Sequence, residues 1–297
     1  MRNPDRADRW WSVIESRLPD PRLVEVTLNG ETVLAHADAT ILDVCRDANV
    51  DIPTMCFLKT LSPFNSCRLC VVEVTGSRTL VPSCSRTVDG GMEITTESER
   101  IANTRRTLYE MYASTVDLSL ADEETQNWMA KYDVNIDRFG LYESHRDVKV
   151  QDDLYIRDYD RCVMCYRCVA ACGPDAQNTF AIDVAGRGLS ATISTEFDVV
   201  LPDSACVYCG NCIGVCPTGA LMFKSEYDMR AAGTWNEDRQ TVTTTICSFC
   251  GVGCNLDLHV QDNRVVKVTS PVDDDITDGH LCIKGRFGYA YLQSESE

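Results

Sequence analysis

The sequence lacks any apolar run approaching the roughly 18 residues that a membrane-spanning helix requires. Its first twenty residues also lack the apolar core of a secretory leader, because they are interrupted by Arg2, Asp5, Arg6, Asp8 and Arg9. We therefore expect a cytoplasmic protein without membrane insertion, in which thiols stay reduced.

Lysine and histidine are scarce. The 297 residues include 6 Lys and 4 His, against 22 Arg, 29 Asp and 16 Glu, and the formal net charge is −17. This acidity argues against nucleic acid and anionic membranes as partners, because both are negatively charged. An ordinary acidic protein can have this balance, but the many carboxylates and few lysines favour adaptation to high salt.

Cysteine, by contrast, is abundant, and 16 of the 17 cysteines fall into four groups. The groups are Cys56/Cys67/Cys70/Cys84, Cys162/Cys165/Cys168/Cys172, Cys206/Cys209/Cys212/Cys216 and Cys247/Cys250/Cys254/Cys282. Their C-x2-C spacings favour metal clusters over a disulfide framework. The remaining Cys45 lies on the apolar stripe of a helix that we expect after Thr40, so we interpret it as a core thiol.

The two middle groups share the spacing C-x2-C-x2-C-x3-C, which is typical of paired [4Fe-4S] clusters. In such pairs, three cysteines hold one cluster and the fourth reaches the other cluster. We therefore predict one [4Fe-4S] cluster on Cys162, Cys165, Cys168 and Cys216, and another on Cys206, Cys209, Cys212 and Cys172. Two zinc sites are the weaker alternative, because zinc prefers cysteine pairs well separated in sequence.

The outer groups have different spacings. The first, C-x10-C-x2-C-x13-C, keeps the close pair of plant-type [2Fe-2S] ferredoxins but has a longer first gap. The last, C-x2-C-x3-C-x27-C, is followed closely by Lys284, Gly285 and Arg286. A zinc knuckle and a zinc ribbon are the respective alternatives.

Both outer groups resemble known iron–sulfur domains. Residues 67–74 (CRLCVVEV) resemble the [2Fe-2S] domain that opens the large peripheral subunit of NADH:quinone oxidoreductase, many formate dehydrogenase α subunits and iron-only hydrogenases. Residues 246–254 (ICSFCGVGC) and 280–286 (HLCIKGR) resemble the N-terminal [4Fe-4S] module of molybdopterin oxidoreductases, most closely formate dehydrogenases. The resemblance implies a [2Fe-2S] cluster on Cys56, Cys67, Cys70 and Cys84, and a third [4Fe-4S] cluster on Cys247, Cys250, Cys254 and Cys282. It also implies that Lys284 relays electrons between cluster and pterin, with a solvated surface lysine as the alternative.

These patterns predict an α+β, multi-domain iron–sulfur protein. The expected order is a lead-in (residues 1–21), a β-grasp [2Fe-2S] ferredoxin-like domain (22–97), a helical connector (98–150), a bacterial-ferredoxin-like domain for two [4Fe-4S] clusters (151–230) and a small β-rich [4Fe-4S] module (240–297). Asn29-Gly30 and Asp262-Asn263 are expected hairpin turns, and Thr40 is an expected helix N-cap.

Two features of many relatives are missing from the sequence. An additional cluster held by one histidine and three cysteines has no counterpart, since the connector has only His145. This argues against NADH:quinone oxidoreductase itself and predicts about 14 iron atoms per chain rather than about 18. The domains that bind molybdenum- or tungsten-pterin are also missing, as is a nucleotide-binding glycine loop. We expect molybdopterin in a separate catalytic subunit, in preference to a truncated reading frame.

The favoured interpretation is an oxidoreductase component, namely the electron-transfer subunit of a formate-dehydrogenase-like molybdopterin oxidoreductase. Electrons would pass from the pterin through three [4Fe-4S] clusters and one [2Fe-2S] cluster to an acceptor such as a diaphorase. No residue of this chain is expected to act as general acid or base. An iron–sulfur subunit of a hydrogenase or NADH dehydrogenase is one alternative, disfavoured by Lys284-Gly285-Arg286. An iron–sulfur redox sensor is another, disfavoured because no DNA-binding element is evident.

Overall fold

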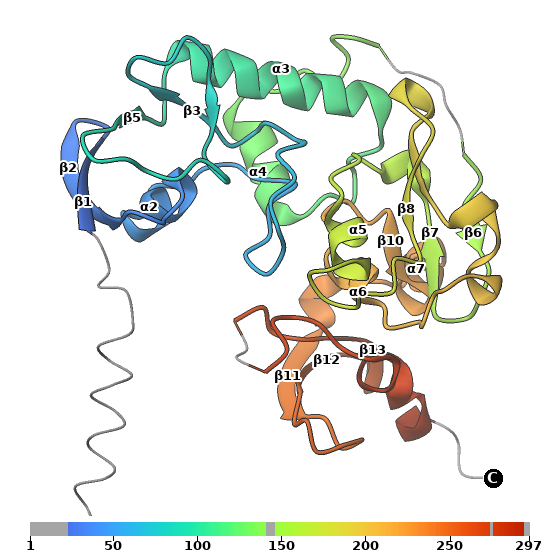
Figure 1. Ribbon diagram of the computed structural model, residues 1–297. Helices are drawn as coiled ribbons and strands as arrows, with labels where there is room; N and C mark the ends of the chain where they lie inside the picture. The colour runs from blue at the N-terminus through green and yellow to red at the C-terminus, as the bar shows by residue number, and fades with distance from the viewer. Residues whose placement is uncertain (1–22, 141–145, 274–275, 294–297) are drawn as a thin grey trace, which may run out of the picture. The chain divides into compact units, whose positions relative to one another are not determined.

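The computed structural model describes residues 23–140, 146–273 and 276–293 (Figure 1). The chain forms two units. Unit 1 comprises Met1–Ile52 and Leu69–Asn103, and unit 2 comprises Pro53–Arg68 and Thr104–Glu297. The expected lead-in over residues 1–21 and the solitary His145 lie outside the described residues.

Unit 1 begins with the hairpin that the sequence predicts. Strands β1 (Leu23–Leu28) and β2 (Glu31–His36) pair antiparallel around a two-residue turn. Asn29 and Gly30 both have positive φ, at 51° and 90°, as a type I′ turn requires. Such a turn matches the twist of the strands it joins, so these two residues fix the register of the hairpin.

The hairpin is part of a five-stranded mixed sheet with the order β2-β1-β5-β3-β4, in which β1 and β5 run parallel. The other strands are β3 (Val71–Val74), β4 (Val81–Pro82) and β5 (Glu93–Thr95). Before β4, the Ser77 N–H donates to the Val74 carbonyl and the Ser77 hydroxyl donates to the Thr79 carbonyl, which holds the β3-β4 connection in a turn. Unit 1 thus combines a mixed sheet with a helix, which agrees with the predicted α+β class.

Helix α2 (Ile41–Asp47) starts at a capping box. The Thr40 hydroxyl accepts from the Asp43 N–H at 3.1 Å, and the Asp43 carboxylate accepts from the Thr40 N–H at 2.9 Å. Cys45 is completely buried on the inner face of this helix. The predicted N-cap and the predicted burial of Cys45 are thus confirmed.

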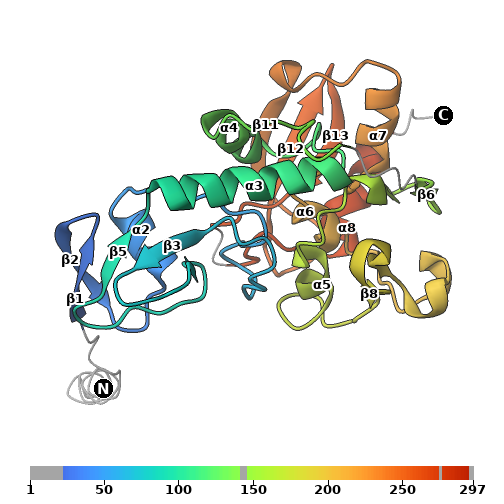
Figure 2. The same cartoon turned by 90° about the horizontal axis from the view of Figure 1, so that it is seen from above.

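The range 98–140 contains two helices. Helix α3 (Glu99–Thr115) is one unbroken helix, followed by α4 (Glu123–Lys131) (Figures 1 and 2). Its buried Arg105 donates to the Tyr132 hydroxyl at 2.7 Å. A hydrogen bond between buried side chains therefore joins α3 to the end of α4.

The central part of unit 2 contains the internal repeat. Two short helices, α5 (Arg167–Cys172) and α6 (Asn211–Gly214), lie side by side, and each begins after a residue in the left-handed region. A sheet of order β10-β7-β6 and the hairpin β8-β9 accompany them. These strands are β6 (Lys149–Val150), β7 (Tyr155–Arg157), β8 (Asp183–Ala185), β9 (Thr192–Ser194) and β10 (Leu221–Phe223).

The last part of unit 2 is a three-stranded antiparallel meander, β11-β12-β13, preceded by α7 and followed by α8. Asp262 and Asn263 form the predicted turn between β12 and β13, with φ of 52° and 62°. The elements are α7 (Lys224–Ala231), β11 (Thr241–Ile246), β12 (Asn255–Gln261), β13 (Arg264–Thr269) and α8 (Ile283–Phe287).

Short 3₁₀ turns complete the described chain, at Tyr159–Arg161, Gly188–Ser190, Glu196–Asp198, Leu201–Asp203, Glu237–Arg239 and Gly288–Gln293. Within the part of the chain that the structure describes, no helix is both long and apolar enough to cross a bilayer.

Candidate iron–sulfur centres

Four cysteines from two distant segments line one cavity in unit 2. They are Cys162, Cys165 and Cys168, at the start of α5, and Cys216, after α6. The remaining wall is mostly apolar or aromatic and is formed by Tyr159, Val163, Tyr166, Ile193, Thr218, Ala220 and Leu221. Four thiols around a largely apolar cavity fit a [4Fe-4S] cluster, which takes four thiolate ligands.

Burial changes the acidity of these thiols. Together with the neighbouring Cys216, burial raises the pKa of Cys162 to about 11 and that of Cys165 to about 12. In the metal-free protein these thiols are therefore protonated near neutral pH. Iron must displace their protons, so cluster assembly in this cavity releases protons and is favoured by higher pH.

The second set repeats this arrangement in crosswise order. Cys206, Cys209 and Cys212 precede and begin α6, and Cys172 at the end of α5 is the charged neighbour of Cys209 and Cys212. Burial raises the pKa of Cys212 well above its usual value. The structure therefore brings each three-cysteine loop near the fourth cysteine of the other loop.

The two loops have the same backbone geometry. Met164 and Tyr166 have positive φ of 53° and 66°, and Tyr208 and Gly210, in the corresponding positions, have 54° and 71°. These turns direct main-chain N–H groups to sulfur, as in the 3.4 Å bond from Tyr208 to Cys206. Such donors stabilise negative charge on sulfur and therefore on a bound cluster.

Side chains add further donors in the second set. The Tyr155 hydroxyl lies 3.3 Å from the Cys206 sulfur, and the Ala181 N–H donates to the Cys172 sulfur at 3.2 Å. The Thr179 hydroxyl lies 3.4 Å from the Cys172 sulfur as well. Three groups beyond the cysteine loop can therefore donate hydrogen bonds to sulfur atoms of the second set.

The cysteines of the first group fall in both units. Cys56 and Cys67 belong to unit 2, where hydrogen bonds from Cys67 and Ser66 lower the pKa of Cys56 to about 5 despite its burial. Cys70 and Cys84 belong to unit 1, where they are 1% and 0% exposed. All four side chains are buried, which suits cluster ligands because the protein must keep water away from the cluster.

Three cysteines of the last group lie along the β11-β12 connection, and Cys282 immediately precedes α8. Cys254 has the other three, Cys247, Cys250 and Cys282, as charged neighbours. Gly253 has a φ of 78°, and this loop is closed by the 2.8 Å bond from the Cys247 N–H to the Cys254 carbonyl. The structure therefore brings this predicted set together.

This last set is more open than the other three. Cys250 and Cys282 are exposed, whereas Cys247 is buried. Lys284, in the first turn of α8, is also exposed. A further protein surface can therefore approach this set from the side of Lys284.

Among the described residues, no three His, Cys, Asp or Glu side chains converge closely enough to hold one metal ion. Cys162, Cys165, Cys168 and Cys216 instead line a cavity, which suits a multinuclear cluster better than a single zinc ion.

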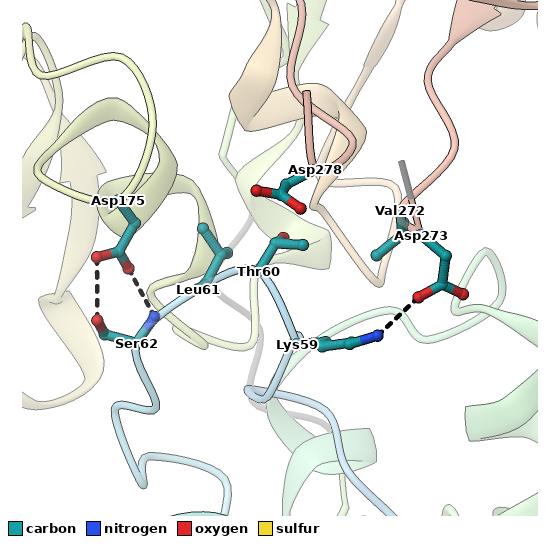
Figure 3. Close-up of a pocket in the computed structure, with 8 residues that line it drawn as sticks. All are labelled: Lys59, Thr60, Leu61, Ser62, Asp175, Val272, Asp273 and Asp278. Atoms are coloured by element: carbon teal, nitrogen blue, oxygen red, sulfur yellow. Dashed lines mark hydrogen bonds and ion pairs between the residues drawn. The ribbon is translucent and has the colours of Figure 1, made fainter. Parts of the chain in front are cut away.

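A separate cleft in unit 2 shows how the segment that carries Cys56 and Cys67 is anchored (Figure 3). Asp175 accepts from the Ser62 N–H at 2.6 Å and from its hydroxyl at 3.0 Å, and Lys59 pairs with Asp273 at 2.9 Å. Leu61 also packs in a core cluster of unit 2. These bonds explain why Pro53–Arg68 groups with unit 2, although residues 22–97 were predicted to form one domain.

Two buried arginines had no predicted role. Arg167 follows Cys165 by two residues and donates to the Phe57 carbonyl at 2.6 Å. Arg286 is completely buried against the loop of Cys209. In the sequence, the Lys284-Gly285-Arg286 motif draws attention to Arg286, but nothing in the sequence indicates that this side chain is buried.

Three family models match separate parts of the chain. Residues 21–99 match a 2Fe-2S iron–sulfur cluster binding domain, residues 154–222 match the ferredoxin-like domain of NADH-quinone oxidoreductase subunit 3, and residues 240–294 match the molybdopterin oxidoreductase Fe4S4 domain. The chain thus contains mixed α/β domains of the [2Fe-2S] and [4Fe-4S] ferredoxin-like kinds.

Several characterised or named proteins are similar over most of this chain. The α subunit of an NADPH-Fe(3+) oxidoreductase from Geobacter sulfurreducens is 32% identical over 92% of the chain and 32% of its own length. An NADH-quinone oxidoreductase subunit from Rhizobium meliloti is 30% identical, over 92% of the chain and 32% of its own length. A putative formate dehydrogenase from Staphylococcus haemolyticus is 25% identical, over 91% of the chain and 31% of its own length. The chain therefore spans about a third of these relatives.

A solved structure is also similar. In the crystal structure of NAD+-reducing [NiFe]-hydrogenase in the H2-reduced state, one chain superimposes with a TM-score of 0.61 and 27% identity. The match covers 68% of this chain and 87% of that chain.

Proposed function

We propose that this chain conducts electrons in a formate-dehydrogenase-like enzyme. The premise is that it belongs to the iron–sulfur proteins that join three domains: a [2Fe-2S] domain, an NADH-quinone-oxidoreductase-type ferredoxin domain and a molybdopterin oxidoreductase Fe4S4 domain. Sixteen cysteines would hold the clusters in the four sets predicted above. When bound, each cluster accepts and releases one electron at a time. The observation that carries this proposal is the crosswise proximity of Cys216 to the Cys162 loop and of Cys172 to Cys212.

Contacts within unit 2 support an order for these sets. Arg286, four residues after Cys282, donates to the carbonyl of Cys209, so the last set neighbours the second cubane set. Tyr112 lies near Cys56, Cys67 and Cys165, so the first cubane set neighbours the Cys56 segment. These contacts support one electron-transfer path, which passes through the Cys282 set, the Cys209 set, the Cys165 set and the Cys56 segment in that order.

The protein's own part is to exclude water and to stabilise negative charge on sulfur. Buried walls around Cys162 and Cys165, and N–H donors such as that of Tyr208, do both. At the open end, the exposed Cys282 and Lys284 leave room for a pterin-binding domain, whether it is a separate subunit or part of a longer chain. Molybdenum or tungsten would be held there.

Formate as the electron source is supported by the Lys284-Gly285-Arg286 ending and by the formate-dehydrogenase-like relative. A hydrogenase- or NADH-dehydrogenase-type role is the second candidate. The observations that favour it are the similarity to a hydrogenase chain and to the NADH-quinone oxidoreductase subunit from Rhizobium meliloti.

Iron counting combined with low-temperature EPR of the anaerobically purified chain tests the cluster assignment. We expect about 14 iron atoms per chain, divided between one [2Fe-2S] signal and three [4Fe-4S] signals. A count near 8 would refute the assignment of four centres.

The complex isolated from its native host tests the catalytic assignment. We expect molybdenum or tungsten in the complex and formate-dependent reduction of a dye. A complex that lacks both metals and reduces dye only with H2 or NADH would establish the second candidate instead. Cluster loss that changes gene expression without electron transfer would support the sensor alternative.

A further inference from the structure

Arg286 is a buried cation at the junction between two cysteine sets. Its side chain is 0% exposed. Nε donates to the Cys209 carbonyl at 3.0 Å, Nη2 donates to Asn211 Oδ1 at 3.1 Å, and Nη1 reaches the Val268 carbonyl at 3.5 Å. All three acceptors are neutral. Among the described residues, no carboxylate forms an ion pair with this guanidinium.

A buried charge without a counter-charge is costly, so the negative charge that balances Arg286 must come from elsewhere. Arginine stays protonated in proteins, so this guanidinium is charged at neutral pH. The ionisable groups nearest to it include Cys209, Cys212 and Cys282. These side chains become thiolates when they ligate a cluster, so the bound clusters would supply the counter-charge of Arg286.

The second repeat leaves space for this side chain, and the first repeat does not. A Cβ atom on Gly210 would lie 2.3 Å from Arg286 Cδ, and a Cβ on Gly214 would lie 3.2 Å from Nη1. The corresponding positions of the first repeat are Tyr166 and Ala170. The absence of two side chains at one cysteine loop thus creates a slot that Arg286 fills.

We propose that Arg286 is an electrostatic positioning residue, which makes the Cys172/Cys206/Cys209/Cys212 cluster easier to reduce and fixes it against the Cys282 set. The inference rests on the proposed cluster ligands, but not on formate as the substrate. Reduction adds one electron and no proton to a cluster that is already negative. A fixed positive charge nearby favours the reduced form, and low dielectric strengthens this effect.

The test is an EPR-monitored redox titration of the full chain, with dithionite as reductant and mediators present. Arg286→Gln removes the charge and keeps an amide donor, whereas Arg286→Lys keeps the charge. We expect the Gln variant to show at least a tenfold lower reduced-to-oxidised ratio of the second cubane at fixed potential, a shift of about 59 mV for a one-electron couple. The Lys variant should keep most of the wild-type ratio.

Arg230→Gln is the matched control, because Arg230 is a cation of the same unit that is balanced by Glu226 and Glu237. It should leave all cluster potentials unchanged. A Cys206→Ser variant identifies which EPR signal belongs to the second cubane. If that variant leaves every signal and the iron content intact, the ligand assignment fails, and the proposal for Arg286 fails with it.

The proposal is overturned if Arg286→Gln has full iron content and wild-type potentials, or if the Lys and Gln variants shift the potential equally. If the Gln variant does not fold, a semisynthetic chain joined at Cys282 and carrying citrulline at position 286 replaces it. Citrulline is neutral but has nearly the shape of arginine. An unchanged potential in that protein would likewise overturn the proposal.

Discussion

Individual donors to sulfur distinguish the two cubane sets at the scale of single residues. The Tyr155 hydroxyl is 3.3 Å from the Cys206 sulfur, and its ring is 3% exposed. Burial and the nearby thiolates raise the pKa of Tyr155, so the phenol keeps its proton throughout the physiological range. Towards a cluster-bound Cys206 sulfur, which has no proton, it therefore acts as the donor.

Tyr155→Phe should accordingly lower the potential of the second cubane. A hydrogen bond contributes about 0.5–1.5 kcal/mol, and the loss falls mainly on the reduced, more negative state. Redox titration of the full chain measures the shift. Tyr159→Phe is the control, because its hydroxyl accepts from Arg157 at 3.4 Å instead of bonding to sulfur. Equal shifts in both variants would contradict this role for Tyr155.

At the scale of secondary-structure elements, the sequence predicts turns and helix starts correctly where a few adjacent residues determine the backbone conformation. The turns at Asn29-Gly30 and Asp262-Asn263 and the N-cap at Thr40 need only their own backbone and nearest side chains. The crosswise grouping of cysteines also followed from spacing alone, because the repeat encodes it. These are the parts of the fold and of the candidate sites that the sequence could predict.

Long-range packing could not be predicted in the same way. The segment of Cys56 joins unit 2 through bonds to residues more than a hundred positions away, such as that from Ser62 to Asp175. Arg286 is buried because Gly210 and Gly214 lack side chains, and this depends on two loops meeting in space. No periodicity or spacing in the sequence contains that information.

An ion network links helix α7 to strand β13 and thereby holds the last module to the cubane domain. Glu226, which is 8% exposed, accepts from Arg230 at 2.8 Å and from Lys267 at 3.0 Å. Glu226→Gln should lower stability by about 1–3 kcal/mol, because two cations lose a mostly buried partner. The loss of visible cluster absorbance on heating measures the effect.

Glu237→Gln is the matched control for this network. Glu237 also pairs with Arg230, at 2.9 Å, but its side chain is 69% exposed. An exposed pair contributes about 0–1 kcal/mol, so this variant should melt close to wild type. Equal destabilisation by the two variants would show that burial of Glu226 does not matter.

For the whole molecule, the dominant property is the net charge of −17, which bound clusters would make more negative. Many of its carboxylates are exposed, including Glu31, Asp51 and Asp153. Mutual repulsion among such groups destabilises a compact chain, and salt screens that repulsion. Stability should therefore depend on ionic strength more steeply than in a protein of balanced charge.

We expect the apparent melting temperature to rise between about 0.1 M and about 1 M KCl, over which the Debye length falls from about 10 Å to about 3 Å. Calorimetry or cluster absorbance under anaerobic conditions measures it. A variant with Glu31→Gln, Asp51→Asn and Asp153→Asn should show a smaller rise, because less repulsion remains to be screened. Equimolar sucrose, which is uncharged, separates screening from general solvent exclusion. A melting temperature that falls as KCl rises would remove the argument for adaptation to high salt, since the surface charge would then contribute stabilising pairs that salt weakens.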